Sequence, residues 1–441
     1  MSDRSDLPDL SLQQMSAALR TGEVTALALL DAHLDRIAAR DPSVKAWAWL
    51  DPDQARAQAI ALDAAQAEGK ALGPLHGIPV GLKDVIDTAD MPTENGTPPD
   101  AGRQPDQDAW ITARLRAVGA VIVGKTTTTE LAFLNPTETL NPHNPNHTPG
   151  GSSAGSAASV AAGMVPLAVG TQTGGSVIRP AAFCGVVGVK PTFGAIPRQG
   201  VTMQSHTLDT LGVFTRDAED AAFALTCMMD TEDSDPATLP PQDAHPAIAG
   251  ATRPPVFGFV RPPEWDRASA ETKAALEKLA QALGAIPLSL PESFEQVADL
   301  RARINFAEMA WHYSRYRTAG WDALSAATRD AMEAGAACAA VDYLAALMQR
   351  EPLYASLDPL FSQVDCLLCP SALGAAPEGL SSTGDAIFNG LWTFMGTPCV
   401  TLPLPETEKG LPIGVQLVGR RGEDRALLSK AIWLQGHMGK N

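Results

Sequence analysis

One segment, residues 149–191, constrains the fold and the chemistry of this chain more than any other. It is crowded with Gly, Ser and Ala, and its first charged side chain is Arg179. Serine lies in two glycine turns, at 150–153 and 174–176, and the small apolar residues at 154–168 predict a helix packed tightly inside the protein. A hydroxyl at such a turn is a candidate nucleophile, and the neighbouring N–H groups are candidate donors to an oxyanion.

Two other interpretations of this segment are weaker. Runs of Gly and Ser are often flexible linkers, but aliphatic side chains interrupt this one from Val160 to Val189, so it can pack into a core. A phosphate-binding loop needs a Gly-Lys-Ser/Thr sequence, and neither turn has that lysine. The G-x-G-x-x-G pattern of dinucleotide-binding folds is also missing from the segment.

Five further segments accompany the two turns, and together with them they resemble the amidase signature family of serine hydrolases. They lie at 75–84 (LHGIPVGLKD), 119–126 (GAVIVGKT) with Glu130, 208–212 (LDTLG), 396–398 (GTP) and 410–416 (GLPIGVQ). The resemblance covers nearly the whole chain and is weakest over 231–360. It implies hydrolysis of C–N bonds without a metal or another cofactor.

The resemblance also assigns three catalytic positions. It makes Ser176 the nucleophile, Ser152 the bridging serine and Lys83 the base. The two serines stand 24 positions apart, which is the separation found across the family. In the family the bridging serine follows a cis peptide bond, which here is the bond between Gly151 and Ser152.

Taken by itself, Lys83 leaves several roles open. It is the one lysine within the apolar run 78–87, where a charged ammonium is costly to bury. Such a lysine lies exposed, pairs with a carboxylate such as Asp84 or Asp87, or loses its proton. From the residues alone, the ion pair and the catalytic role have equal weight, and the resemblance favours the catalytic role.

A neutral lysine would start a proton relay. Lys83 would accept the proton of Ser152, which would in turn deprotonate Ser176 for attack on a carbonyl carbon. His143 and His147, in the loop before the first turn, are the alternative bases, although no specific spacing supports them.

The second turn also supplies the predicted oxyanion hole and its neighbours. Ser153 and Gln172 are expected to support the site by hydrogen bonding, and many family members have Asp where Gln172 stands. Arg179 either holds a substrate carboxylate or pairs internally with an acidic residue, and the internal pair is favoured. The expected oxyanion donors are the backbone N–H groups of Thr173, Gly174, Gly175 and Ser176.

Charge and composition restrict the partners. The chain has 33 Lys and Arg against 50 Asp and Glu, a net charge of −17, so binding to nucleic acid or to an anionic membrane is not expected. It has neither an apolar run of about 18 residues nor a signal sequence at its start, which predicts a cytoplasmic protein.

The six cysteines are scattered, which also suits a reducing compartment. Cys366 and Cys369 form a C-x-x-C pair inside an apolar strand, where alternation puts the two thiols on opposite faces. No second pair completes a zinc site, so these cysteines are expected to be structural.

Alternating strands and helices predict an α/β fold: a single large domain with a central mixed, mostly parallel twisted β-sheet covered by helices on both faces. His33 and His312 are expected on helix faces without a catalytic role. Substrate contacts are expected from within 125–147 and 300–395. The expected parts are an N-terminal helical layer (1–70), the signature core (75–230), a Pro- and Asp-rich surface linker (231–255), a variable, mostly helical region (256–360) and C-terminal strands with a helix (361–441).

These observations predict a stand-alone hydrolase of small amides, including aryl amides and carbamates (urethanes), and of related esters, that acts as a monomer or homodimer. The alternative is an amidotransferase A-type subunit, which would need partner subunits and tRNA. A non-catalytic member of the fold is disfavoured because Lys83, Ser152 and Ser176 are all retained.

Overall fold

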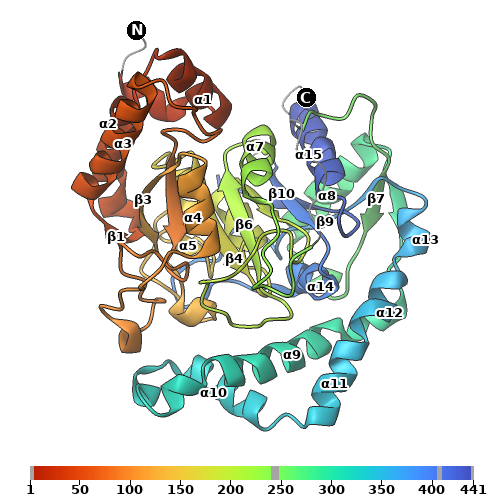
Figure 1. The fold of residues 1–441 in the computed structure, drawn as a ribbon. Helices are drawn as coiled ribbons and strands as arrows, with labels where there is room; N and C mark the ends of the chain where they lie inside the picture. The colour runs from red at the N-terminus through yellow and green to blue at the C-terminus, as the bar shows by residue number, and fades with distance from the viewer. Residues whose placement is uncertain (1–3, 240–247, 405–409, 439–441) are drawn as a thin grey trace.

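A large β-sheet runs through the whole protein (Figure 1). The computed structural model describes residues 4–239, 248–404 and 410–438, and in them the sheet has eleven strands in the order β1-β3-β2-β4-β6-β5-β10-β11-β9-β7-β8. The strands are β1 (Trp47–Leu50), β2 (Pro79–Lys83), β3 (Val121–Thr126), β4 (Leu167–Gln172), β5 (Val187–Lys190), β6 (Thr210–Thr215), β7 (Phe257–Val260), β8 (Ile286–Leu288), β9 (Cys366–Pro370), β10 (Cys399–Pro403) and β11 (Gly414–Val418).

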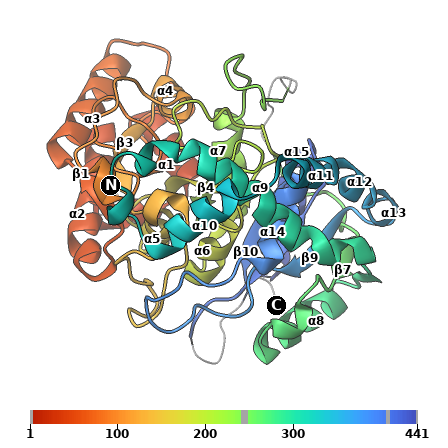
Figure 2. The same ribbon diagram turned by 90° about the horizontal axis from the view of Figure 1, so that it is seen from below.

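Helices flank this sheet, which confirms the α/β class. Helices α1 to α3 form a layer at the β1 end of the sheet, and α9 to α12 extend below it as an arm that crosses in front of α14 when seen from below (Figures 1 and 2). The helices are α1 (Leu12–Thr21), α2 (Ala26–Val44), α3 (Pro52–Ala67), α4 (Trp110–Ala117), α5 (Ala154–Ala161), α6 (Ile178–Cys184), α7 (Ala218–Met228), α8 (Ala270–Ala282), α9 (Val297–His312), α10 (Ala326–Ala336), α11 (Ala340–Met348), α12 (Arg350–Ala355), α13 (Asp358–Phe361), α14 (Ile387–Met395) and α15 (Asp424–Met438).

The sheet is mixed, as predicted, but it is not mostly parallel. Parallel pairs occur where β2 lies beside β3 and β4, and where β7 lies beside β8 and β9. The other neighbours pair antiparallel. The reason is that β5 leads to β6, and β10 to β11, without an α-helix in the described residues, whereas a parallel crossover usually needs one.

The helix predicted over 154–168 is shorter than expected. Helix α5 ends at Ala161, and strand β4 already begins at Leu167. Gly163 stops the helix in a left-handed conformation, with φ of 69°, and Pro166 cannot donate the backbone hydrogen bond that a longer helix would require. The small residues of α5 are buried as predicted, and they bring its start close to the sheet.

The cysteine pair behaves as the alternation predicts. Cys366 and Cys369 are both fully buried free thiols on β9. Cys366 packs into the main hydrophobic cluster and Cys369 into a second cluster on the other side of the strand. Neither belongs to a group of potential metal ligands in the described residues.

The division into parts remains a prediction. The N-terminal layer contains the expected helices, and its first one begins with a capping box at Ser11, but it also contributes the edge strand β1. Of the predicted linker 231–255, residues 240–247 lie outside the described residues. Before that gap, Asp235 is buried and paired with Arg198 at 3.0 Å.

In the described residues, no single helix is both long enough and apolar enough to cross a membrane, and only the bent pair Ala326–Ala336 and Ala340–Phe361 meets both conditions jointly.

Candidate active site

Lys83 ends strand β2, between β3 and β4. Its side chain is fully buried. Its Nζ lies 2.7 Å from the hydroxyl oxygen of Ser152 and 2.7 Å from that of Thr171 on β4. The predicted meeting of Lys83 with Ser152 is therefore present, while Thr171 is a contact that the sequence did not indicate.

The surroundings of Lys83 favour its neutral form. Burial lowers the pKa of its ammonium group from 10.5 to about 7, and the negative charge of Asp209 offsets part of that effect. No carboxylate forms an ion pair with Lys83 in the described part of the chain. An amine that titrates near neutral pH can serve as a general base.

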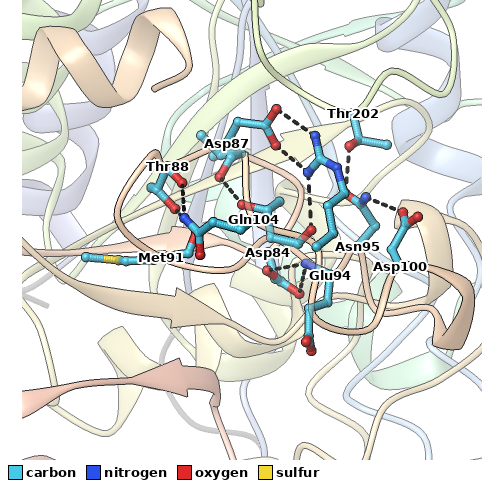
Figure 3. A network of polar contacts seen from close by, with 12 residues as sticks. Asp84, Asp87, Thr88, Met91, Glu94, Asn95, Asp100, Gln104 and Thr202 are labelled. Atoms are coloured by element: carbon cyan, nitrogen blue, oxygen red, sulfur yellow. Dashed lines mark hydrogen bonds and ion pairs between the residues drawn. The ribbon is translucent and has the colours of Figure 1, made fainter. Parts of the chain in front are cut away.

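The carboxylates proposed as ion-pair partners of Lys83 hold the following loop instead (Figure 3). The Asp84 carboxylate accepts a hydrogen bond from the Glu94 backbone at 3.2 Å and lies 3.9 Å from the buried ammonium of Lys125. Asp87 accepts two hydrogen bonds from Arg103, at 2.7 and 2.8 Å. The ion-pair interpretation of Lys83 is therefore wrong, because both carboxylates turn away to the loop.

Ser152 is held between the sheet and helix α5. Its hydroxyl is buried, and its carbonyl accepts a hydrogen bond from Thr129 N–H at 3.1 Å. The peptide bond from Gly151 to Ser152 is cis, as the family resemblance implied. Next to it, the Ser153 hydroxyl donates a hydrogen bond to the Thr171 carbonyl at 3.2 Å and accepts one from the Thr171 N–H at 3.3 Å. Ser153 thus ties the start of α5 to β4, which is the supporting role expected of it.

Ser176 lies in the turn between β4 and α6 and reaches the surface of a cavity of about 130 Å³. The residue is 9% exposed, and it belongs to the wall of that cavity. Among the described residues its hydroxyl forms no hydrogen bond, and so it does not bond Ser152 in this structure.

Gln172 fixes the turn that carries Ser176. Its side-chain oxygen accepts hydrogen bonds from the N–H groups of Val177 at 2.9 Å and Ile178 at 3.0 Å, at the start of α6. Its amide nitrogen donates to the Thr393 hydroxyl at 3.0 Å, which in turn donates to the Gly174 carbonyl at 2.8 Å. The supporting role predicted for Gln172 is therefore specific: it accepts from two N–H groups after Ser176 and, through the Thr393 hydroxyl, is linked to the Gly174 carbonyl before it.

The predicted oxyanion donors line the same cavity. Thr173, Gly174, Gly175 and Ser176 are consecutive residues in its wall. The Thr173 hydroxyl donates to the buried carboxylate of Asp209 at 2.5 Å, which also accepts from the backbone N–H of Ser205 at 3.0 Å. These bonds hold the start of the turn, and sequence reasoning did not single out Asp209.

Arg179 is held internally, but its partners are not acidic. The guanidinium group donates to the Gly151 carbonyl at 2.7 Å and to the Thr383 hydroxyl at 3.2 Å. No carboxylate pairs with it in the described residues, so the predicted acidic partner is wrong. Burial lowers the pKa of Arg179 to about 10. It also lines the cavity, and its Nε is buried without a partner.

The remaining cavity wall comes from two of the expected stretches. Residues 132–134 contribute to it, and so do Ala386 and the α9 residues Arg301, Ala302, Asn305 and Phe306. Arg301 and the polar Gln204 were not indicated by the sequence. A cavity of this size suits a small substrate group, since sites for drug-sized ligands measure about 300–1,000 Å³.

The histidines take no part in this arrangement. His143 Nε2 lies 2.9 Å from the Cys184 carbonyl, and His147 contacts neither serine. His33 is buried against the Met164 carbonyl, and burial lowers its pKa to about 3. His312 ends helix α9 and lies outside the cavity wall. The alternative bases of the sequence analysis, His143 and His147, form no hydrogen bond with either serine in the described residues.

Comparisons with known proteins cover nearly the whole chain. The sequence model of the family described as Amidase matches residues 28–428. The A-type subunit of the glutamyl-tRNA(Gln) amidotransferase of Chloroflexus aurantiacus is 34% identical over 472 residues, which cover 96% of each chain. The putative amidase AmiD of Mycobacterium tuberculosis is 33% identical over 449 residues, 97% of this chain and 94% of that protein.

A solved structure is similar over the same length. It belongs to work on a vestigial protein complex that reveals the evolutionary origins of an s-triazine catabolic enzyme. It superposes with a TM-score of 0.90 at 28% identity and covers 97% of this chain and 98% of that one.

Proposed function

The chain belongs to the amidase family, and on that basis we propose that it is a stand-alone serine hydrolase that forms an acyl-enzyme on Ser176. Its substrates are small amides, including aryl amides and carbamates (urethanes), together with esters. The cytoplasm is its proposed location, and it acts as a monomer or homodimer without a cofactor.

The contact between Lys83 and Ser152 carries this proposal. A buried amine 2.7 Å from a serine hydroxyl, with its pKa lowered to about 7, is the combination that base catalysis through a serine requires. An ammonium group kept charged by a carboxylate could not accept that proton. The cavity that opens at Ser176 gives a carbonyl carbon access to the second hydroxyl.

The reaction follows from these positions. Neutral Lys83 accepts the Ser152 proton as Ser152 accepts that of Ser176, and the Ser176 oxygen bonds to the substrate carbonyl carbon. The proton then returns through the relay to the leaving nitrogen or oxygen, whose bond to carbon breaks. Water repeats the sequence on the acyl-enzyme and releases the acid. The relay requires the Ser176 hydroxyl to approach Ser152 when substrate binds, and such bonds often tighten only in the complex.

The turn before Ser176 completes the proposed machinery. Backbone N–H groups of Gly174, Gly175 and Ser176 stabilise the negative oxygen of the tetrahedral intermediate, with Thr173 as the fourth candidate donor. Loss of one such donor typically costs about 2.7–4 kcal/mol in the barrier. Gln172 and Asp209 keep these groups in place before the reaction begins.

The test combines labelling and turnover. The isolated protein should react with a fluorophosphonate at Ser176, located by mass spectrometry, and should hydrolyse at least one class in a panel of anilides, primary amides, carbamates and esters. The Ser176→Ala variant should lose both properties and keep its fold, while Ser43→Ala, which changes an exposed serine, should keep both. Covalent labelling at any other serine, or acyl-enzyme formation by Ser176→Ala, contradicts the assignment.

The second candidate function is that of an amidotransferase subunit. The identity to the A-type subunit of glutamyl-tRNA(Gln) amidotransferase favours it. Such a protein would release little product alone and would gain activity only with partner subunits and an acylated tRNA. Turnover of the panel by the purified single chain separates the two, with size-exclusion chromatography giving its oligomeric state.

A further inference from the structure

The cavity at Ser176 has a cationic wall. Arg179 and Arg301 both line it together with the turn 174–176. Gln204 adds a side-chain oxygen that is buried without a hydrogen-bond partner. In a protein of net charge −17, two guanidinium groups at one small cavity need an explanation.

Arg301 has no partner of its own. Its side chain forms neither a hydrogen bond nor an ion pair in the described residues, and its Nε is buried without a partner. Burial accordingly lowers the pKa of this group, and Asp385 opposes the change from a distance. The carboxylate of Asp385 is engaged elsewhere, with Arg267 at 2.5 Å. Arg301 is half-buried, and a guanidinium nitrogen buried without a partner is costly, so a structural role alone does not account for this side chain.

Two glycines place this guanidinium against the reaction centre. A Cβ at Gly174 would lie 3.2 Å from Nη1 of Arg301, and a Cβ at Gly390 would lie 2.5 Å from its Nε. Larger residues at 390 would push the arginine away. Arg301 therefore reaches from helix α9 across α14 to the turn whose N–H groups are the proposed oxyanion donors. An anion bound to Arg301 would lie beside the carbonyl group under attack.

We propose that Arg301 binds a carboxylate of the substrate, so that the enzyme acts on small amides that carry a carboxylate a few bonds from the scissile carbonyl. This rests on the proposed function and names the substrate class of the same site. The planar fork of an arginine matches the two oxygens of a carboxylate. Arg179 contributes positive charge nearby, while its two hydrogen bonds keep it in place.

Direct binding tests the proposal without any turnover. Isothermal titration calorimetry should detect succinate or glutarate binding to the wild-type protein, and Arg301→Ala should weaken it about 10-fold or more, since one hydrogen bond to a charged group is worth about 1.5–3 kcal/mol. Arg303→Ala is the matched control, because Arg303 lies on the same helix but is exposed and pairs with Asp342 at 3.7 Å. The neutral diamides of the two acids should bind at least 10-fold more weakly than the acids.

Turnover gives an independent measurement. The wild-type protein should hydrolyse succinamic or glutaramic acid, followed by ammonia release, with a kcat/KM about 10- to 100-fold above that for the amide in which an isopropyl group replaces the carboxylate. Arg301→Gln should bring this ratio near one, whereas the control Arg303→Ala, at an exposed arginine of the same helix, should keep the ratio of the wild type.

The outcomes separate the two proposals. Equal binding of acids and diamides, or unchanged acid binding in Arg301→Ala, overturns the carboxylate site even if Ser176 reacts with the fluorophosphonate. Arginine-dependent acid binding without reaction at Ser176 supports the carboxylate site and rejects the proposed function. If Arg301→Ala does not fold, Arg301→Gln and Arg301→Lys replace it in the titration, with folding checked by circular dichroism.

Discussion

Replacing Lys83 by Met should change the pH dependence of stability in a defined direction. Burial lowers the pKa of Lys83 from 10.5 to about 7 in the folded protein, whereas the unfolded chain keeps the ordinary value. Between these two values the unfolded state binds the proton more tightly, so wild-type stability rises with pH. Below pH 7 the folded protein carries the full free-energy cost of burying a charged Lys83, and above pH 10.5 this cost is absent because the lysine is neutral in both states. Methionine has a similar length and no proton to bind, so this pH-dependent cost is missing from the variant.

The magnitude follows from the size of the pKa shift. A shift from 10.5 to about 7 corresponds to a cost of about 5 kcal/mol in the fully charged limit, at about 1.4 kcal/mol per unit. Met at this position leaves the hydroxyls of Ser152 and Thr171 without their partner, each at about 1–3 kcal/mol. These two effects oppose each other at pH 7, but only the first varies with pH. The stability of Lys83→Met relative to wild type should therefore fall by about 1.4 kcal/mol per pH unit between pH 7 and 10.

Urea unfolding of both proteins at pH 7, 8, 9 and 10 measures this difference, and other titrating groups cancel because they are common to both. The control Lys278→Met removes an exposed lysine and should give a difference that is flat with pH. A flat difference for Lys83→Met as well would refute a buried amine with a lowered pKa. In the same wild-type protein, kcat/KM should rise through pH 7 and then level off, since the neutral amine is the active form.

Two further substitutions test the groups that hold the site. Thr171→Val removes one of the two oxygens 2.7 Å from Lys83; it should lower kcat/KM about 10-fold and move the rising limb of its pH profile, while an unmoved limb with lower activity would indicate a packing effect only. Gln172→Ala removes the acceptor shared by the Val177 and Ile178 N–H groups; it should lower kcat about 10- to 100-fold with a smaller change in KM, and Gln172→Glu, which keeps the acceptor, should recover part of the loss.

Local patterns and the family resemblance together singled out the proposed catalytic positions. Lys83 interrupts an apolar strand, and Ser152 and Ser176 lie at glycine turns, so each is a candidate from its immediate neighbours, while the resemblance assigns the roles. The α/β class followed in the same way from alternating strands and helices. The prediction of a mostly parallel sheet was wrong because the direction of a strand depends on the connection that leads to it. The connection from β5 to β6 contains no α-helix, and the sequence pattern did not reveal this.

Contacts made through space could not be read from the chain. Thr171 meets Lys83 only because β4 pairs with β2, and Thr is common on strands for reasons of packing alone. Asp84 and Asp87 follow Lys83 closely in sequence. Asp84 nevertheless pairs with Lys125, and Asp87 pairs with Arg103. Arg179 was expected to need an acidic partner, but backbone and hydroxyl oxygens satisfy it. Proximity along the chain was thus a poor guide to partnership for charged groups.

The proposed proton relay and the proposed carboxylate site lie on different parts of the fold, the relay on the sheet and the carboxylate site on helix α9. Lys83 and the turn at Ser176 belong to strands β2 and β4 and their ends, where pairing on both sides limits movement. Arg301 lies on α9, which belongs to the arm below the sheet (Figure 1), lines the cavity and packs on α10, α11 and α14. A change on α9 can therefore alter the recognised group without disturbing the proton relay. By this reasoning, Arg301 variants should change the choice of substrate while Ser176 keeps its reactivity toward a fluorophosphonate, and a parallel loss of both would mean that α9 also shapes the catalytic turn.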